Sequence, residues 1–357
     1  MTKKQSFLTR LKSDRKTQIT VFVVCLLVVF LIVVVAYFVR RDSEETGKID
    51  VEEKDTLGLI SRHLDGVLVD VEHANPYPEA VMIENLKSVR PQSGLSEAGV
   101  VYEALAEGGI TRFMAMYAGG TSDVIGPVRS ARPYFVDLAS EYNALYVHAG
   151  GSPESLLKIP GSDIYSINQI GGDHAYYWRD KSLKAPHNLF TKSELLEYAL
   201  RDKNLLDKKP EYQTWTFEDE ASLTARPEGE KEMTIPFSSE AYEVVYMYDR
   251  DKNVYKRFNG GNPHVDATTG EQLEAKNVIV QYAEKKVVDD EGRLEVEVIG
   301  EGDALYAKNG EVAQGTWKKE NTNARTEFLD EDGNPVAFAR GQLWIEIVPT
   351  DKEVIYN

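Results

Sequence analysis

An uncharged apolar run near the amino terminus divides the chain into two unequal parts. The run extends from Ile19 to Val39 and follows a segment that is rich in lysine and arginine. It is long enough to cross the hydrocarbon core of a bilayer as a helix. We therefore predict a basic tail at 1–17, a transmembrane helix at 18–39 and a folded part beyond it.

The flanks of this run predict its orientation and its processing. Positive residues are denser before the run than after it, which places the amino terminus in the cytoplasm and the long carboxyl-terminal part outside the cell. A cleaved signal peptide would have a shorter apolar region. Cys25, the only cysteine, follows Val23 and Val24 rather than the small residues that precede a lipid-modified cysteine. We predict a single-pass protein of the cell membrane without an intrachain disulfide.

The charge of the chain restricts its partners. The formal net charge is −17, which argues against a nucleic-acid partner, because nucleic-acid binders usually need a basic surface. Residues 40–62 are polar and acidic and are predicted to be a linker between membrane and folded part. An anionic ligand would have to enter a local basic pocket.

Two regions of different pattern follow the linker. Residues 63–208 alternate short apolar strands with helical stretches, which predicts an α/β domain. Strands are expected at 80–83, 98–105, 110–117, 124–128 and 144–148, and helices from Pro133, from Pro153 and over 192–201. Thr191 and Glu194 have the spacing of a capping box for the last helix.

Residues 209–357 are almost free of helical periodicity. They alternate in hydrophobicity, and turns such as Asn309-Gly310 separate the expected strands. This pattern predicts a mostly-β domain, either a small barrel or a sandwich. Trp317 and Trp344 lie in strand contexts, where tryptophan is more often part of the core than a platform for sugar stacking.

A loop with two arginines begins the first predicted helix. Pro133 suits the first helical turn, so Arg129 and Arg132 lie where the helix dipole already presents partial positive charge. An anion between the arginines and the exposed amides would explain this arrangement. It could be a carboxylate of the chain itself or a phosphate or carboxylate of a ligand.

Other polar residues extend this candidate site. Glu103 and Glu107 could be a catalytic pair or the partners of Arg112 and Arg129, since a buried arginine usually needs a carboxylate. Histidines next to turns could satisfy loop hydrogen bonds, contact a ligand, carry protons or, with Asp173, hold a metal. The predicted ligand-binding residues are Arg90, Glu103, Arg112, Arg129, Arg132, His148 and His187.

Motifs for a particular reaction are missing from the sequence. It contains no phosphate-binding loop, dinucleotide fingerprint, zinc-protease motif or nucleophile elbow. Ser130 lies between two arginines, but no general base is near it in the sequence. We therefore predict no cofactor and no metal, and name no catalytic residue.

Several strings resemble the YerB-like family of bacterial envelope proteins. They include AVMIEN at 80–85, RPQSGL at 90–95, EGGITRF at 107–113, IGPVRSARPY at 125–134, APHN at 185–188 and GQLW at 341–344. The resemblance covers nearly all of the chain beyond the linker, in two segments. It implies an exported, membrane-attached protein but no reaction, since the domains are of unknown function. Many members resemble lipoproteins, whereas this chain carries a transmembrane run.

Three functions are compatible with these observations. The first is binding of an anionic cell-envelope ligand, such as a lipid-linked phosphate or a wall glycopolymer fragment, by arginine forks. The second is envelope phosphoryl or glycosyl transfer, because the layout resembles that of the LytR-CpsA-Psr phosphotransferases; Asp123 and Asp137 would be the candidate metal ligands. The third is a scaffold for cell-wall synthesis proteins.

Overall fold

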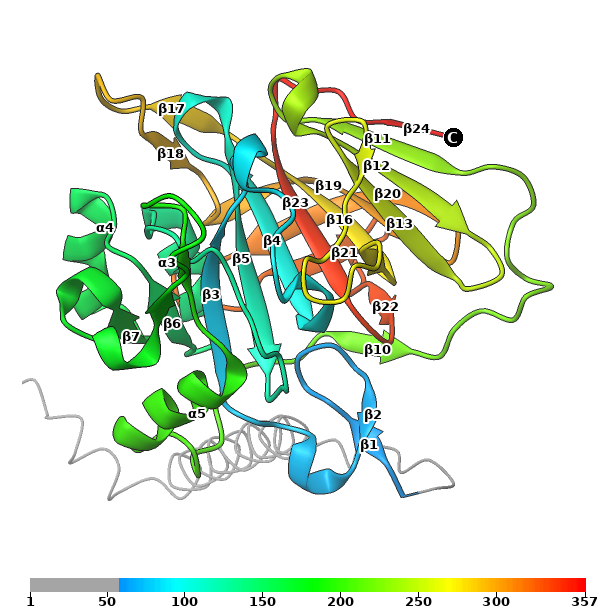
Figure 1. Ribbon diagram of the computed structural model, residues 1–357. Coiled ribbons are helices and arrows are strands. Elements are labelled where there is room, and N and C mark those ends of the chain that lie inside the picture. Colours follow the sequence, from blue (N-terminus) through cyan, green and yellow to red (C-terminus); the bar gives the residue numbers. More distant parts are fainter. Residues whose placement is uncertain (1–57) are drawn as a thin grey trace, which may run out of the picture. The chain divides into compact units, whose positions relative to one another are not determined.

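The computed structural model describes residues 58–357 (Figure 1). The predicted basic tail, the transmembrane helix and most of the acidic linker lie outside the described residues. Within residues 58–357, no helix is both long enough and apolar enough to span a bilayer.

A sheet of ten strands forms the centre of the fold. Its first half comes from residues before 170: β3 (Pro78–Glu84), β4 (Val100–Leu105), β5 (Thr111–Ala118), β6 (Leu145–His148) and β7 (Tyr165–Asn168). Its second half contains β16 (Asn277–Ala283), β19 (Gly300–Lys308), β20 (Glu311–Lys319), β21 (Glu327–Asp330) and β23 (Leu343–Pro349). The strand order is β21-β20-β19-β16-β23-β4-β5-β3-β6-β7.

The two halves join where β23 pairs in parallel with β4. Residues 209–357 are β-rich, as predicted, but they do not form a separate barrel or sandwich, because five of their strands belong to this common sheet. Without β23, β4 would expose a row of unpaired backbone groups along a sheet edge. Every residue of β23 is buried, and the described residues belong to one compact unit.

A second, antiparallel sheet covers part of one face of the central sheet (Figure 1). Its strands are β14 (Asn262–Pro263), β13 (Val254–Asn259), β12 (Glu243–Asp249), β11 (Glu232–Pro236) and β24 (Ile355–Tyr356), with β15 (Glu274–Ala275) pairing with β13. Four smaller pairs are β1 (Ile60–Ser61) with β2 (Leu68–Val69), β8 (Trp178–Arg179) with β9 (Leu189–Phe190), β10 (Thr216–Glu218) with β22 (Ala337–Ala339), and β17 (Lys285–Val287) with β18 (Leu294–Val296).

The central sheet is buried on both faces. In β3, Val81 and Ile83 face one core cluster together with α5 (Ser193–Asp202) and the second sheet, whereas Ala80 and Met82 face the other with α3 (Pro133–Ser140). This explains the continuous apolar pattern of the strand, since a strand covered on both sides needs apolar residues at successive positions. Trp317 and Trp344 are buried, as the strand context indicates.

The three α-helices of residues 58–357 confirm most of the local predictions. Pro133 begins α3, and α4 (Pro153–Lys158) is capped by Ser152, whose side chain accepts a hydrogen bond from the Ser155 amide. The capping box of α5 is wrong, because the Thr191 hydroxyl donates to the Tyr176 carbonyl instead. Short 3-10 turns lie at Val71–His73, Lys87–Val89, Leu95–Glu97, Glu107–Gly109, Ile159–Gly161, Gln169–Gly171, His174–Tyr176 and Glu240–Tyr242.

The strand predicted at 124–128 is also wrong. This segment makes only isolated bridges, such as Ile125 with Thr191 and Val128 with Ile83. The preceding strand, β5, already pairs with β3 on one side and β4 on the other. Because both of its edges are occupied, no returning strand can form a hairpin with it.

Candidate functional site

The predicted site residues gather near one end of the strands of the central sheet. Strands β3, β6 and β7 are parallel, so their carboxyl ends, with Glu84 and His148, lie on the same side of the molecule. In open α/β sheets, ligands bind outside the carboxyl ends of the strands. Arg112 lies directly opposite Glu84 in the β3–β5 register, and the Arg129 amide donates to the Met82 carbonyl.

The anion at the N-terminus of α3 is the carboxylate of the chain's own Glu107. Both oxygens of this carboxylate accept hydrogen bonds from Arg132, with Nη2 at 2.6 Å from Oε2. Arg112 donates from Nη1 to the Ser130 carbonyl at 2.7 Å, and its Nη2 lies 3.8 Å from Glu107. Burial would raise the pKa of Glu107, but the hydrogen bonds and charge of Arg132 outweigh it and lower the pKa. Burial and the neighbouring Arg132 lower the pKa of Arg112 to about 10.

A second carboxylate, Glu84, holds Arg129 and His187. Its Oε1 lies 3.1 Å from Nε of Arg129, and its Oε2 lies 2.7 Å from Nδ1 of His187. The Glu84 side chain is 7% exposed, whereas those of Arg129 and His187 are 26% and 25% exposed. Arg129 and His187 therefore lie nearer the surface, around a buried carboxylate.

His148 lies at the same edge but inside the protein. Its Nδ1 is 2.7 Å from the Gly150 carbonyl and its Nε2 is 2.8 Å from the Ser166 hydroxyl. Burial lowers its pKa. Both ring nitrogens are engaged by neighbouring residues, so the geometry favours a structural role over the predicted ligand contact.

Glu103 belongs to a buried polar network that the sequence analysis missed. Its carboxylate accepts hydrogen bonds from Arg257 and from Thr111 at 2.5 Å. Arg257 also donates to the Tyr246 hydroxyl at 3.0 Å and contacts His264. A signal for this network exists in the sequence, because Arg257 falls on the buried phase of the alternating strand β13.

Arg90 is held by neutral groups. It donates from Nε to Asn85 Oδ1 and from Nη1 to the Ala241 carbonyl, each at 2.8 Å, and its guanidinium lies over the Tyr242 ring. Burial lowers its pKa. Within residues 58–357, no carboxylate forms an ion pair with it.

Arg90 also lines a cavity of about 220 Å³. The walls of this cavity, which we call the Arg90 cavity, are Lys87, Arg90, Pro91, Asn259, Gly260, Asn262, Pro263, His264 and Val265. They include two cationic side chains and no aspartate or glutamate. The local charge is therefore opposite to that of the whole chain.

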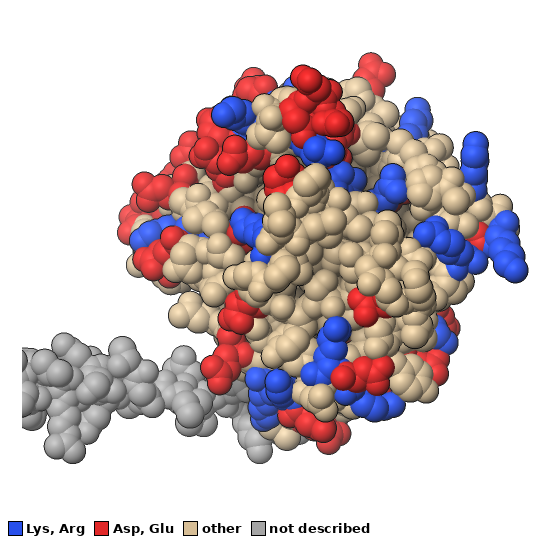
Figure 2. Space-filling model, turned by 90° about the vertical axis from the view of Figure 1, so that its left-hand side faces the viewer, with Lys and Arg blue, Asp and Glu red and all other residues tan. Residues whose placement is uncertain are grey.

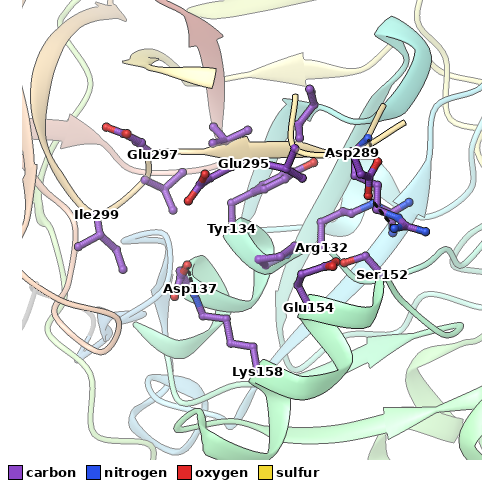
Figure 3. A pocket seen from close by; sticks show the side chains of 16 residues that line it. Arg132, Tyr134, Asp137, Ser152, Glu154, Lys158, Asp289, Glu295, Glu297 and Ile299 are labelled. Atoms are coloured by element: carbon purple, nitrogen blue, oxygen red, sulfur yellow. Dashed lines mark hydrogen bonds and ion pairs between the residues drawn. The ribbon is translucent and has the colours of Figure 1, made fainter. Parts of the chain in front are cut away.

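A larger cavity, of about 520 Å³, lies at the N-terminus of α3, between α3, α4 and the β17–β18 hairpin. Figure 3 shows Lys158 reaching Asp137, with Glu295 and Glu297 on the opposite wall. Its acidic lining residues are Asp137, Glu154, Asp289, Glu295 and Glu297, and its basic ones are Arg132, Lys158 and Arg293. This surplus of carboxylates disfavours an anion, although the cavity lies where the helix start predicted one.

Acidic and basic side chains are also separated on the wider surface. On the face that carries α4 and β7, acidic side chains gather at the upper left of Figure 2, and lysines and arginines lie along the right-hand side.

The two aspartates considered as metal ligands lie in different cavities, Asp123 in one and Asp137 in the other. They therefore do not form a common metal site beside the arginines.

The comparisons with known proteins agree with the resemblance seen in the strings. Residues 64–206 match "Protein of unknown function (DUF3048) N-terminal domain", and residues 233–345 match "Protein of unknown function (DUF3048) C-terminal domain". The chain belongs to the DUF3048 family.

A relative and a solved structure support membership of the DUF3048 family. The chain is 31% identical over 295 residues to "Putative lipoprotein YerB" of Bacillus subtilis, covering 83% of this chain and 88% of that protein. A crystal structure of the YerB protein from Bacillus subtilis superposes with a TM-score of 0.74 at 29% identity. The match covers 84% of this chain and 99% of that chain. The DUF3048 fold thus includes both halves of the central sheet.

Proposed function

We propose that this DUF3048 protein is a membrane-attached protein of the bacterial cell envelope that binds an anionic envelope ligand through the Arg90 cavity. The relative named as a lipoprotein supports the location. The apolar run at 18–39 would anchor this chain and place the described residues outside the cell. The ligand would be a phosphate-bearing molecule, such as a lipid-linked phosphate or a wall glycopolymer fragment.

The observation that carries this proposal is a cationic cavity on an acidic protein. The carbonyl and amide oxygens around Arg90 orient its guanidinium without neutralising it. Five N–H groups are available on an arginine, and Asn85 and Ala241 accept three of them. The remaining N–H groups and the Lys87 ammonium can hold phosphate oxygens by charge-assisted hydrogen bonds.

The Arg129–His187 pair would extend the same binding surface. Arg90 bonds to Asn85, the residue next to Glu84, which holds Arg129 and His187. A ligand with more than one anionic group could thus contact both places. Arg112 and Arg132 of the predicted set would not take part, because Glu107 and the Ser130 and Ala131 carbonyls already bind their guanidinium groups.

Calorimetry on the full-length chain in nonionic detergent tests the proposal, with inorganic phosphate and glycerol 3-phosphate as probes. We expect saturable binding that Arg90→Gln weakens by at least about tenfold, since hydrogen bonds to charged groups contribute about 1.5–3 kcal/mol. Lys286→Gln, which removes an exposed lysine of β17, is the matched control and should bind like the unchanged protein. Equal binding by the Arg90 and Lys286 variants would contradict the proposal.

The Glu84–His187 pair favours a second candidate, an envelope phosphoryl- or glycosyl-transfer enzyme. Glu84 orients the imidazole through Nδ1, and in the described part of the chain Nε2 has no partner, so it could accept or donate a proton. If the protein is such an enzyme, His187→Gln abolishes turnover of an envelope phosphate substrate while phosphate binding persists. If it is only a binding protein, no turnover is found before or after the change.

A further inference from the structure

A buried carboxyl group lies at the other end of β3. Glu79 is 5% exposed, and its side chain points to the same face of the sheet as Val81 and Ile83, toward α5. No hydrogen bond or ion pair joins this side chain to another residue of the described range 58–357. An unpartnered buried carboxyl group is costly, so its position needs an explanation.

Glu79 lines a cavity of about 620 Å³, which we call the Glu79 cavity. Its walls come from the start of β3, the loop after β5 and α5. Its polar lining includes Glu79, Thr121, Asp123, Lys192, Ser193 and Glu197. The volume lies in the range of small-molecule sites, and the walls carry carboxyl and hydroxyl groups beside a few apolar side chains.

The charge of this cavity is negative even after its ion pairs are considered. Glu194 is paired with Lys192 at 2.5 Å, and Glu197 with Arg201 at 2.6 Å. This leaves the Asp123 carboxylate and the Glu79 carboxyl group without an ion pair in residues 58–357. A positively charged group entering the cavity would supply the missing partner.

We propose that the Glu79 cavity binds a ligand that carries a primary ammonium group, with the Glu79 carboxylate as its counter-ion. The three N–H donors of such a group would bond to the Glu79 carboxylate and to hydroxyl oxygens of the cavity wall, where Thr121 and Ser193 lie; the Ser193 oxygen already accepts from the Ser122 amide and keeps one lone pair for the ligand. Two sources share this chemistry, an amino sugar and a lysine side chain. The site is separate from the Arg90 cavity. Glu79 lies near the start of β3, whereas Arg90 bonds to Asn85, just beyond the other end of this strand.

Protonation of Glu79 is linked to this binding. Burial and then the charge of Glu197 raise its pKa to about 8, so the empty site holds a proton near neutral pH. Besides Glu197, the groups around the cavity are Glu194 and Lys192 at α5, Asp123 in the loop after β5, His73 before β3, and Tyr117, which is opposite Glu79 in β5. An ammonium group would displace the proton, because it favours the ionised carboxylate.

Titration calorimetry of the full-length chain in nonionic detergent tests the proposal. The probes are glucosamine and Nα-acetyl-lysine methylamide, each compared with its N-acetylated form, which has lost the charge. We expect one of the two amines to bind and its acetylated form to bind at least about tenfold more weakly. The amine that binds identifies the source. Binding of the acetylated forms with equal affinity, or no binding by either amine, would overturn the proposal.

Two further measurements locate the site. Glu79→Gln should weaken amine binding at least about tenfold, whereas Glu331→Gln, at an exposed turn, should not. In the unchanged protein at pH 7, titrations in buffers of different ionisation enthalpy should show release of close to one proton for each amine bound. An unaffected Glu79→Gln variant, or binding without proton release, would exclude Glu79 as the counter-ion. The proton measurement decides the question even if the variant does not fold.

Discussion

Glu103 in β4 and Arg257 in β13 form an ion pair in which neither side chain is exposed to solvent. The pair joins the central sheet to the second sheet. Tyr246 and His264 contact the same guanidinium. The central carbon of this guanidinium lies 4.3 Å from the centroid of the Trp344 ring. A buried charge pair of this kind makes the packing of the two sheets sensitive to the loss of either partner.

Removing the guanidinium should therefore destabilise the protein strongly. Arg257→Met leaves the Glu103 carboxylate buried without its cation, and we expect the free energy of unfolding to fall by about 3–5 kcal/mol. Urea denaturation followed by fluorescence measures the change. The double variant Glu103→Gln/Arg257→Met should recover part of the loss, since it removes the uncompensated charge. A loss below about 1 kcal/mol in the single variant would show that the pair does not hold the sheets together.

Two arginines of the predicted site should respond differently to truncation. Arg132 is bound at both carboxylate oxygens of Glu107 and at the Ala131 carbonyl, so Arg132→Ala should cost about 2–3 kcal/mol of stability. Arg129 is more exposed and has one ion pair, so Arg129→Ala should cost less than about 1 kcal/mol. Thermal denaturation of both variants checks this, and equal losses would contradict the distinction.

The pKa of Glu79 predicts how stability changes with pH in the absence of a ligand. This pKa is raised from its ordinary value of 4.5 to about 8, mainly by burial, so the folded state keeps a proton that the unfolded state releases. The bound proton therefore contributes to the free energy of unfolding, and this contribution is fully present below pH 4.5 and is lost as the pH rises toward 8. Glu79→Gln, which cannot ionise, should be more stable than the unchanged protein by about 3–5 kcal/mol at pH 8.

Denaturation curves of both proteins at pH 5 and pH 8 test this prediction. The two proteins should have nearly equal stability at pH 5 and diverge as the pH rises. If the difference between their free energies of unfolding is the same at both pH values, Glu79 does not keep its proton in the folded state.

A close approach of two strands predicts the cost of a methyl group at Gly315. A Cβ at this position in β20 would clash with the Leu329 carbonyl oxygen of β21, which cannot move without changing the sheet. We expect Gly315→Ala to lower stability by at least about 2 kcal/mol. Gly161→Ala is the matched control, because a Cβ there meets no atom within 4 Å, and its thermal midpoint should stay nearly unchanged.

The sequence by itself determined where many of the strands and helices lie. Pro133 and Ser152 mark helix starts through local backbone and capping preferences, and apolar runs such as 80–83 and 144–148 mark strands. These signals act over a few residues, so they can be read along the chain. The acidic composition likewise indicated that an anion site must be local.

Only the tertiary structure decided which strands share a sheet and which acid neutralises each arginine. Glu107 is 25 residues from Arg132, and Glu103 is 154 residues from Arg257. From the sequence alone, Glu103 and Glu107 are both possible partners for the same arginines, and no local pattern connects Glu103 to Arg257. The reason is physical: a local pattern specifies that a carboxylate is buried, whereas its partner depends on which strands meet when the two segments of the chain pair at β4 and β23.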